Sequence, residues 1–201
     1  MPDAMPTDPF DLFDAWFAEA SASEPVDPNA MCLATTTPEG FPSARTVLLK
    51  GLDKKGHAER GFLFYTNVES RKGQELAANR HVALLFHWKS LGRQVRIEGE
   101  ALPVTGADAD AYFATRARIS RLGAWASDQS RPLIGRDELE ARVATFDRRF
   151  PGDDIPRPPN WSGFRVVPGY FEFWQDQPFR LHDRLTYRHA GGGWELGRLY
   201  P

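Results

Sequence analysis

The chain has 201 residues, 41% of them hydrophobic, so it is long enough to bury a core and fits a single domain. Its 25 lysines and arginines nearly balance its 27 aspartates and glutamates, for a formal net charge of -2. This balance argues against a protein that attracts nucleic acid or an anionic membrane over its whole surface, so an anion would have to bind at a local group of cations.

The sequence indicates no secretory leader, membrane span or disulfide. No basic segment followed by an apolar run occurs near the N-terminus, and no run of about 18 apolar residues occurs anywhere. The one cysteine, Cys32, lies in an apolar run typical of a buried strand, and it excludes an internal disulfide or a thiolate metal cluster. We therefore expect a cytoplasmic protein with no metal site.

A helix is predicted first, followed by a series of strands. Phe10, Phe13 and Phe17 fall on one helical face, with Asp8 or Asp11 as the N-cap. Runs rich in β-branched and aromatic residues then predict strands at 31–37, 44–53, 62–67, 81–88 and 93–104. These runs are too close in sequence for helical crossovers, so we expect a mainly antiparallel sheet that closes, or nearly closes, into a barrel.

Three further helices and two long strands are predicted. The helices are expected at 69–80, 106–127 and 136–150, the strands at 163–175 and 179–189, and a last strand-like segment from residue 194. The Pro-rich connection at 151–161 is a poor domain boundary, because neither side holds enough strands to close its own sheet. We predict an N-terminal segment at 1–28, made of the first helix and mobile residues, and one domain at 29–201.

Clustered cations occur on one predicted strand and at the start of the helix that follows. Arg45 and Lys50 leave opposite faces of a regular strand, which fits two anionic partners, one elongated ligand or simply two wet strand ends. In the helix that starts near Ser70, Arg71 and Lys72 occupy the first turn, next to free backbone N–H groups that bind phosphate well. The helix dipole disfavours cations there, so a ligand explains them better than helix stability does.

A polar stripe is predicted on the helix that begins at residue 106. Tyr112, Arg116 and Ser120 are spaced at i, i+4 and i+8, so a phenol, a guanidinium and a hydroxyl fall in line. These three groups can bind the oxygens of one phosphate. The alternative is a solvated face on which Tyr112 is half-buried.

The end of the chain adds aromatic and cationic residues. The motif RLHDR places Arg180, His182 and Arg184 on one face of a predicted strand. Trp174 closes an aromatic run, either as a core residue or as a wall for a planar ligand. Gln94 has an amide that suits the edge of a heterocycle such as a flavin. Each of these observations is unspecific when taken alone.

Taken together, eight strings in this order resemble the pyridoxine/pyridoxamine 5'-phosphate oxidase family, the FMN enzymes that make pyridoxal 5'-phosphate. They are RTVLLK (45–50), FYTNVESRKG (64–73), LLFHW (84–88), RQVRIEG (93–99), YFATRARISRLGAWASDQS (112–130), WSGFRV (161–166), EFWQ (172–175) and RLHDRLTY (180–187). The resemblance covers residues 31–201. It implies an FMN-binding split β-barrel of the mainly β, α+β class, which works as a homodimer with FMN between the subunits.

The same resemblance implies the reaction and the residues of the site. Pyridoxine 5'-phosphate or pyridoxamine 5'-phosphate would be oxidised to pyridoxal 5'-phosphate, with O2 as electron acceptor and H2O2 as product. The implied FMN contacts are Arg45, Thr46, Val47, Leu48, Leu49, Lys50, Tyr65, Thr66, Arg71, Lys72, Gln94, Gln129, Ser130, Trp174 and Arg184. The implied substrate contacts are Lys50, Tyr112, Arg116, Ser120, Arg180, Leu181 and His182. Of these, Arg180 and His182 would face the pyridine ring as the catalytic residues.

Two phosphates would explain two groups of cations, Arg45 with Arg71 and Lys72, and Lys50 with Arg116. Two alternatives to this activity stay open. One is an FMN-dependent oxidase of another substrate, such as a phenazine precursor. The other is a non-catalytic module that holds a flavin or a phosphorylated metabolite.

Overall fold

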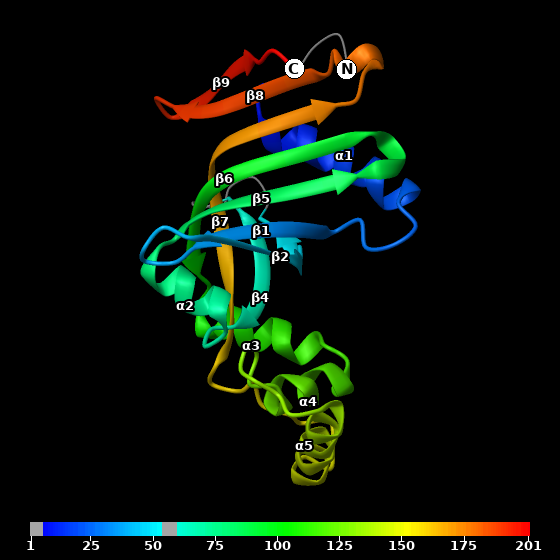
Figure 1. Cartoon of the computed structure of the whole chain (residues 1–201), viewed down its shortest axis with the longest axis vertical. Helices are drawn as coiled ribbons and strands as arrows, with labels where there is room; N and C mark the ends of the chain where they lie inside the picture. The colour runs from blue at the N-terminus through cyan, green and yellow to red at the C-terminus, as the bar shows by residue number, and fades with distance from the viewer. Residues whose placement is uncertain (1–5, 54–59) are drawn as a thin grey trace.

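The computed structural model describes residues 6–53 and 60–201, and this part of the chain forms one curled sheet and five helices, three of which lie together at one end of the molecule (Figure 1). In chain order the elements are α1 (Pro9–Ser23), β1 (Ala30–Thr36), β2 (Pro42–Leu48), β3 (Gly51–Leu52), β4 (Phe62–Asn67), α2 (Arg71–Ala78), β5 (His81–Trp88), the 3-10 turn η1 (Lys89–Leu91), β6 (Arg93–Pro103), α3 (Gly106–Thr115), α4 (Arg118–Ala126), α5 (Arg136–Arg149), β7 (Trp161–Gln175), the 3-10 turn η2 (Pro178–Arg180), β8 (Asp183–Ala190) and β9 (Gly193–Arg198).

All strand pairs among these elements are antiparallel, as the close spacing of the strands predicts. The strand order is β2-β1-β5-β6-β7-β4-β3, with β8 beside β7 and β9 beside β8. The long strand β7 begins near the helices α3, α4 and α5 at one end of the molecule and runs towards the β8–β9 hairpin at the other (Figure 1). The predicted α+β class with an antiparallel sheet is confirmed.

Helix α1 packs on the curled sheet and supplies part of the main core. Asp8 caps the helix by accepting a hydrogen bond from the Phe10 N–H at 3.0 Å, so one of the two expected caps is confirmed. Phe10 and Phe13 are buried against the ring of Phe62 on β4, with centroids 5.8 and 4.9 Å away. The predicted mobile start includes residues 1–5, which lie outside the described residues, and the division at residue 29 stays a prediction.

The helices α3, α4 and α5 form a second, smaller cluster at the start of β7. Phe113, Leu122, Ile155 and Trp161 are buried there. Helix α5 forms where the sequence predicts it, but none of its side chains is fully buried. None of the described helices has the length and apolar character that crossing a bilayer requires.

The single helix predicted at 106–127 is wrong, because two helices meet at a break. Helix α3 ends at Thr115, Arg116 has extended backbone angles of φ -74° and ψ 147°, and α4 begins at Arg118. Arginine and alanine both favour helices, so local propensity gives no warning of this break. A tertiary contact accounts for it, since Arg116 leaves the helix to place its guanidinium over the ring of Trp161.

The strand predicted at 179–189 begins later than expected. Pro178 has no N–H for a strand ladder, and it opens a 3-10 turn that precedes the start of β8 at Asp183. Within the turn, Phe179 and Arg180 have φ values of 59° and 64°, in the left-handed region that non-glycine residues seldom adopt. The motif RLHDR therefore does not lie along one strand face.

Candidate active site

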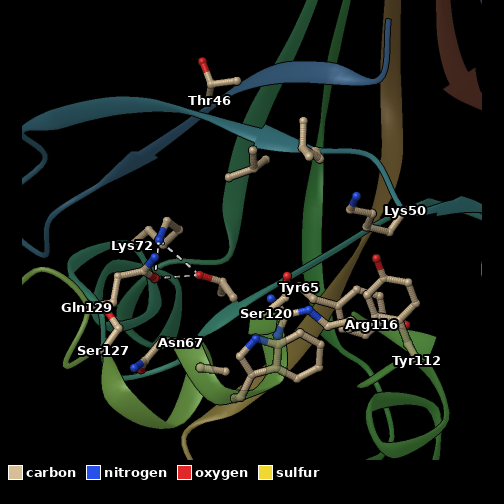
Figure 2. Close-up of a pocket in the computed structure, with 16 residues that line it drawn as sticks. Thr46, Lys50, Tyr65, Asn67, Lys72, Tyr112, Arg116, Ser120, Ser127 and Gln129 are labelled. Atoms are coloured by element: carbon tan, nitrogen blue, oxygen red, sulfur yellow. Dashed lines mark hydrogen bonds between the residues drawn. The ribbon is translucent and has the colours of Figure 1, made fainter. Parts of the chain in front are cut away.

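A cavity of about 490 Å³ opens between the sheet and the helices α2, α3 and α4 (Figure 2). Strands β2 and β4 form one wall, and the first turn of α2, the break between α3 and α4 and the loop after α4 form most of the rest. The residues that the sequence predicts as FMN or substrate contacts and that line this cavity are Thr46, Val47, Leu48, Lys50, Tyr65, Thr66, Lys72, Tyr112, Arg116, Ser120 and Gln129. The predicted FMN contacts Arg45, Leu49, Arg71 and Ser130 do not line it.

Lys72 marks one end of the cavity. Helix α2 has Ser70 as its N-cap, close to the predicted start at residue 69 or 70, and the Ser70 Oγ accepts a backbone hydrogen bond of the first turn at 3.3 Å. Lys72 is buried in this turn, and its Nζ donates to Thr66 Oγ1 at 3.0 Å and to Gln129 Oε1 at 2.9 Å. Burial lowers the pKa of Lys72, and the nearby Arg45 adds to this effect. No carboxylate of the described residues pairs with Lys72, so an anion would stabilise its charge.

Arg116 lies towards the other end of the same cavity (Figure 2). Its guanidinium carbon lies 4.9 Å from the centre of the Trp161 ring. The Nη1 of Arg116 is buried and has no hydrogen-bond partner within residues 6–53 and 60–201. Burial also lowers the pKa of Arg116. A buried donor left unsatisfied costs about 1–3 kcal/mol, so this arrangement indicates a ligand that accepts a hydrogen bond from Nη1.

Three stacked rings lie beside Arg116. Tyr65 stacks on both Tyr112 and Trp161, with ring centroids 4.1 and 5.2 Å away and interplanar angles of 12° and 5°, and the centroids of Tyr112 and Trp161 lie 6.2 Å apart. Gly163, the cross-strand neighbour of Tyr65 on β7, leaves room for this ring, because a Cβ there would lie 2.5 Å from it. Burial raises the pKa of both tyrosines, so their phenols stay protonated near neutral pH and can donate hydrogen bonds.

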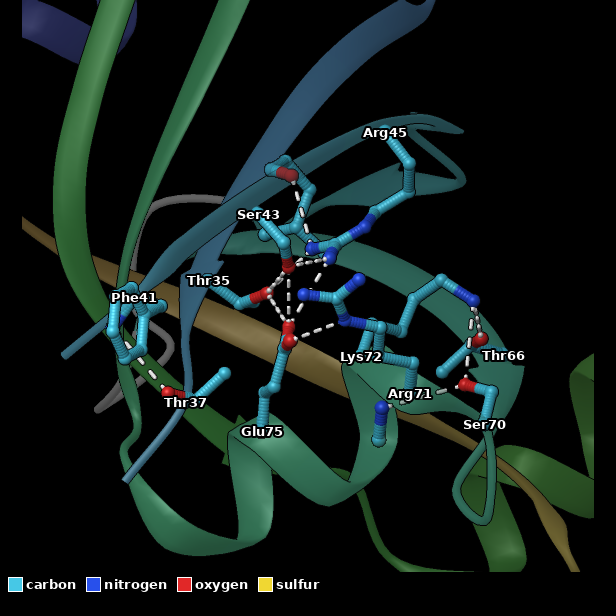
Figure 3. Close-up of polar contacts among 12 residues, drawn as sticks. Thr35, Thr37, Phe41, Ser43, Arg45, Thr66, Ser70, Arg71, Lys72 and Glu75 are labelled. Carbon is cyan, nitrogen blue, oxygen red and sulfur yellow. Dashed lines mark hydrogen bonds and ion pairs between the residues drawn. The ribbon is translucent and has the colours of Figure 1, made fainter. Parts of the chain in front are cut away.

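Arg45 and Arg71 are bound to a carboxylate next to the Lys72 end of the cavity (Figure 3). Arg45 on β2 and Arg71 on α2 both form ion pairs with Glu75, at 3.1 and 2.9 Å. Sequence reasoning missed Glu75, although its i, i+4 spacing from Arg71 on a predicted helix was a usable signal. The expected cluster of Arg45, Arg71 and Lys72 is present, but it also contains the negatively charged carboxylate of Glu75.

The remaining predicted contacts form a second group, which lies on the sheet and does not line the cavity. Gln94, Trp174 and Arg184 are paired in register across β6, β7 and β8. The Nε of Arg184 donates to the buried carboxylate of Glu172 at 2.7 Å. Burial raises the pKa of Glu172, but the hydrogen bonds from Arg184 and Arg96 outweigh burial and lower it. Glu172, which sequence reasoning also missed, therefore holds Arg184 in place.

His182 belongs to this second group. Its ring lies 4.5 Å from the ring of Trp174, and its Nδ1 lies 3.0 Å from a carboxylate oxygen of Asp176. Arg180 and Leu181 precede it and are exposed. The left-handed backbone at Arg180 is of a kind that is found at ligand sites. The structure thus places the residues that the sequence predicts to act in catalysis together, but outside the cavity of their own chain.

The curled antiparallel sheet defines a split-barrel protein, and its cavity presents cations and stacked rings. Residues 17–149 match the model of the family described as Pyridoxamine 5'-phosphate oxidase, and residues 161–201 match the Pyridoxine 5'-phosphate oxidase C-terminal dimerisation region. The chain belongs to the pyridoxine/pyridoxamine 5'-phosphate oxidase family, as the resemblance of its motifs implies.

Relatives and solved structures agree with this assignment. The pyridoxine/pyridoxamine 5'-phosphate oxidase of Rhodospirillum rubrum is 64% identical over 194 residues, which cover 96% of each chain. The structure of PhzG from Burkholderia lata 383, in complex with tetrahydrophenazine-1-carboxylic acid, is 34% identical and has a TM-score of 0.91 over 99% of this chain and 95% of that one. A pyridoxamine 5'-phosphate oxidase-related, FMN-binding protein of Nostoc punctiforme has a TM-score of 0.77 at 16% identity, over 98% of this chain and 100% of that one, and shows the same fold.

Proposed function

We propose that this protein oxidises pyridoxine 5'-phosphate or pyridoxamine 5'-phosphate to pyridoxal 5'-phosphate, with FMN as cofactor, O2 as electron acceptor and H2O2 as product. The 64% identity to a relative named for this activity, along 96% of each chain, supports the proposal. The structural observation that carries it is the buried Nη1 of Arg116, which lacks a partner among the described residues in a cavity that also presents Tyr112 and Ser120.

Four residues are proposed to hold the substrate phosphate. Arg116, Tyr112, Ser120 and Lys50 come from the α3–α4 region and from the segment after β2, and all four line the cavity. The guanidinium and the ammonium supply the charge that a phosphate dianion needs, and the two hydroxyls donate to its remaining oxygens. Anchoring the phosphate fixes the far end of the substrate, which lowers the entropic part of the barrier at the reacting carbon.

FMN is proposed to be held at the Lys72 end of the cavity. Lys72, with Thr66 and Gln129 around its Nζ, and the nearby Arg71 form a cationic end at the start of helix α2 that fits a phosphate. Residues 46–48 of β2 line the same cavity and complete the contacts that one chain offers. When bound, FMN supplies the chemistry of hydride acceptance, which no side chain offers.

We further propose a homodimer in which the second group of residues faces the cavity of the other subunit. Trp174, His182 and Arg184 lie in the segment that matches the dimerisation region, and they do not line the cavity of their own chain. In such a dimer Arg180 and His182 would orient the pyridine ring. The predicted position of FMN between subunits follows from this arrangement, and the cytoplasmic location stays a prediction.

Hydrogen peroxide release tests the proposed reaction. Protein loaded with FMN is expected to form pyridoxal 5'-phosphate and H2O2 in equal amounts from either phosphorylated substrate, with ammonia as a further product of the amine. Because Arg116 recognises the phosphate in this proposal, the unphosphorylated alcohol and amine should react far more slowly. No turnover of either phosphorylated compound would reject the proposal.

The likeness to PhzG favours a second candidate, an FMN-dependent oxidase of a phenazine precursor. The folds agree closely, with a TM-score of 0.91, but the identity is 34% against 64% for the Rhodospirillum rubrum oxidase. The same assay with a reduced phenazine carboxylic acid separates the two candidates. Faster oxidation of that tricycle than of pyridoxine 5'-phosphate would favour the second.

A further inference from the structure

Glu75 is a buried carboxylate that binds four donors from three elements (Figure 3). Its side chain is 5% exposed. Oε2 accepts hydrogen bonds from Ser43 Oγ at 2.7 Å and from Thr35 Oγ1. Oε2 also accepts from Arg45 Nη2 at 3.1 Å, and Oε1 accepts from Arg71 Nε at 2.9 Å. Because Thr35 and Ser43 are cross-strand partners on β1 and β2, the carboxylate ties helix α2 to this strand pair.

The carboxylate keeps its charge in this position. Burial raises the pKa of Glu75, but the hydrogen bonds from the two hydroxyls and the two arginines outweigh burial and lower it to about 2. A buried charge is tolerated where partners compensate its lost hydration, and four donors do so here. The negative charge of Glu75 is therefore present throughout the neutral pH range.

The two arginines differ in what they have left to offer a ligand. Arg45 directs both of its Nη groups at protein acceptors, among them the Leu33 carbonyl at 3.2 Å and Thr35 Oγ1 at 2.5 Å. Arg71 uses Nε for Glu75, its side chain is 63% exposed, and its Nη groups have no partner in the part of the chain that the structure describes. Arg45 is thus a fixed positive charge, and Arg71 is held by one edge and leaves its Nη edge available.

We propose that Glu75 is a positioning residue for the phosphate of FMN, because it holds Arg45 in place and binds Arg71 through Nε, which leaves the Nη edge of Arg71 available at the turn of α2 that also carries Lys72. This inference rests on the proposed function. With three cations and one carboxylate, the cluster carries two net positive charges, which match a phosphate dianion. Glu75 acts only through the arginines, since its own carboxylate would repel the phosphate.

Comparison of FMN with riboflavin, which lacks the phosphate, tests this role in Glu75→Ala. Dissociation constants of both flavins are measured by fluorescence quenching on the full chain freed of flavin. The affinity for FMN is expected to fall about tenfold or more, the scale of one charged hydrogen bond, whereas the affinity for riboflavin stays that of the wild type. A role of Glu75 in folding alone would weaken both flavins equally, and that result would overturn the proposal.

Glu75→Gln provides a second test in a variant of nearly the same shape. One oxygen of the glutamine can still accept from an arginine, and the hydroxyls of Thr35 and Ser43 can turn to face the amide, but a second arginine has no acceptor left. An intermediate loss of FMN affinity is therefore expected. Charge alone predicts the opposite, because removal of a negative charge near the phosphate should tighten FMN. FMN affinity equal to that of the wild type, or tighter, would overturn the proposal even where Glu75→Ala fails to fold.

Glu140→Ala is a matched control. Glu140 on α5 pairs with Arg136 four residues earlier at 2.7 Å, in the same order as Arg71 and Glu75, but both partners are exposed. This substitution should change the binding of neither flavin. Wild-type protein that does not bind FMN would refute the proposed function. Wild-type protein that binds FMN, with Glu75 variants that keep the same preference for FMN over riboflavin, would refute only the role of Glu75.

Discussion

Arg116 and Trp161 lie in contact at the cavity, with the guanidinium carbon 4.9 Å from the centre of the indole ring system. Trp161 begins β7 and Arg116 follows the end of α3, so this contact joins the sheet to the cluster of helices α3, α4 and α5. An aromatic face holds the guanidinium without neutralising it, as a carboxylate would. The guanidinium therefore stays charged, and its buried Nη1, unpartnered within the described residues, is available to donate to an incoming anion.

Arg116→Ala is expected to raise the KM for pyridoxine 5'-phosphate by about 10- to 100-fold, because a charged hydrogen bond to the substrate phosphate is lost. The dissociation constant of FMN should change much less. Steady-state kinetics and flavin titration measure the two effects. Arg136→Ala, an exposed arginine on α5, serves as the control and should alter neither quantity. Equal losses for substrate and FMN would contradict the division of the cavity into two anion sites.

Gly163→Ala is expected to disturb the stacked rings. A Cβ at this position would lie 2.5 Å from the ring of Tyr65 and 2.9 Å from the Phe64 carbonyl oxygen, so ring and backbone must both shift. We expect the free energy of unfolding to fall by about 1–3 kcal/mol, as for other overpacked sites, and KM to rise because Tyr65 stacks on Tyr112. Gly169→Ala on the same strand, where a Cβ meets nothing within 4 Å, is the control for denaturant unfolding and kinetics. Similar losses in the two variants would show that the close contact with Tyr65 is not the cause of the lower stability and higher KM.

Elements whose cause is local could be predicted from the sequence. Asp8, one of the two caps expected for α1, caps that helix, and Ser70, one of the two expected starts, caps α2, because a cap side chain bonds the backbone only two or three residues away. The break at Arg116 could not be predicted in this way. Its neighbours favour a helix, and the contact that draws Arg116 out of the helix is with Trp161, far along the chain.

In the candidate site too, residues whose position depends on local sequence could be predicted, and residues whose position depends on tertiary packing could not. Lys72 could be placed from the first turn of its own helix, and the family resemblance supplied the remaining contacts. The i, i+4 spacing could have paired Glu75 with Arg71, but the contacts of Glu75 with Thr35 and Ser43 could not be found, because these donors lie on strands that precede it by many residues. Whether a charged helical residue becomes buried depends on how the helix packs on the sheet, and no local pattern records that.

Glu75 also predicts how stability depends on pH. In the folded protein its pKa is lowered from the ordinary value of 4.5 to about 2. A carboxyl group with a lower pKa in the folded state stabilises that state above its unfolded pKa, and this contribution is lost as the pH falls through the folded pKa. The free energy of unfolding of the wild type should therefore decrease between pH 4.5 and pH 2, and that of Glu75→Gln should decrease less steeply. Denaturant unfolding at stepwise pH measures this, and parallel curves would contradict it.

Arg184 tests whether two chains build one site. It lies on β8, bound to Glu172, and it does not line the cavity that contains Arg116. In the proposed homodimer each cavity receives Arg184 of the partner subunit, so Arg116→Ala and Arg184→Ala should each impair both sites of their own dimers. A mixed dimer of the two variants would contain one site with both arginines intact and one site that lacks both.

Refolding the two variants together, or producing them together with different affinity tags, yields such mixed dimers. Their activity with pyridoxine 5'-phosphate should rise well above that of either parent variant, towards half that of the wild type per dimer. If each site instead belonged to a single chain, every site in the mixture would carry one substitution, because each chain carries either the change at Arg116 or the change at Arg184. In that case mixing would give only the average of the two variants, and the proposed placement of the second group would be wrong.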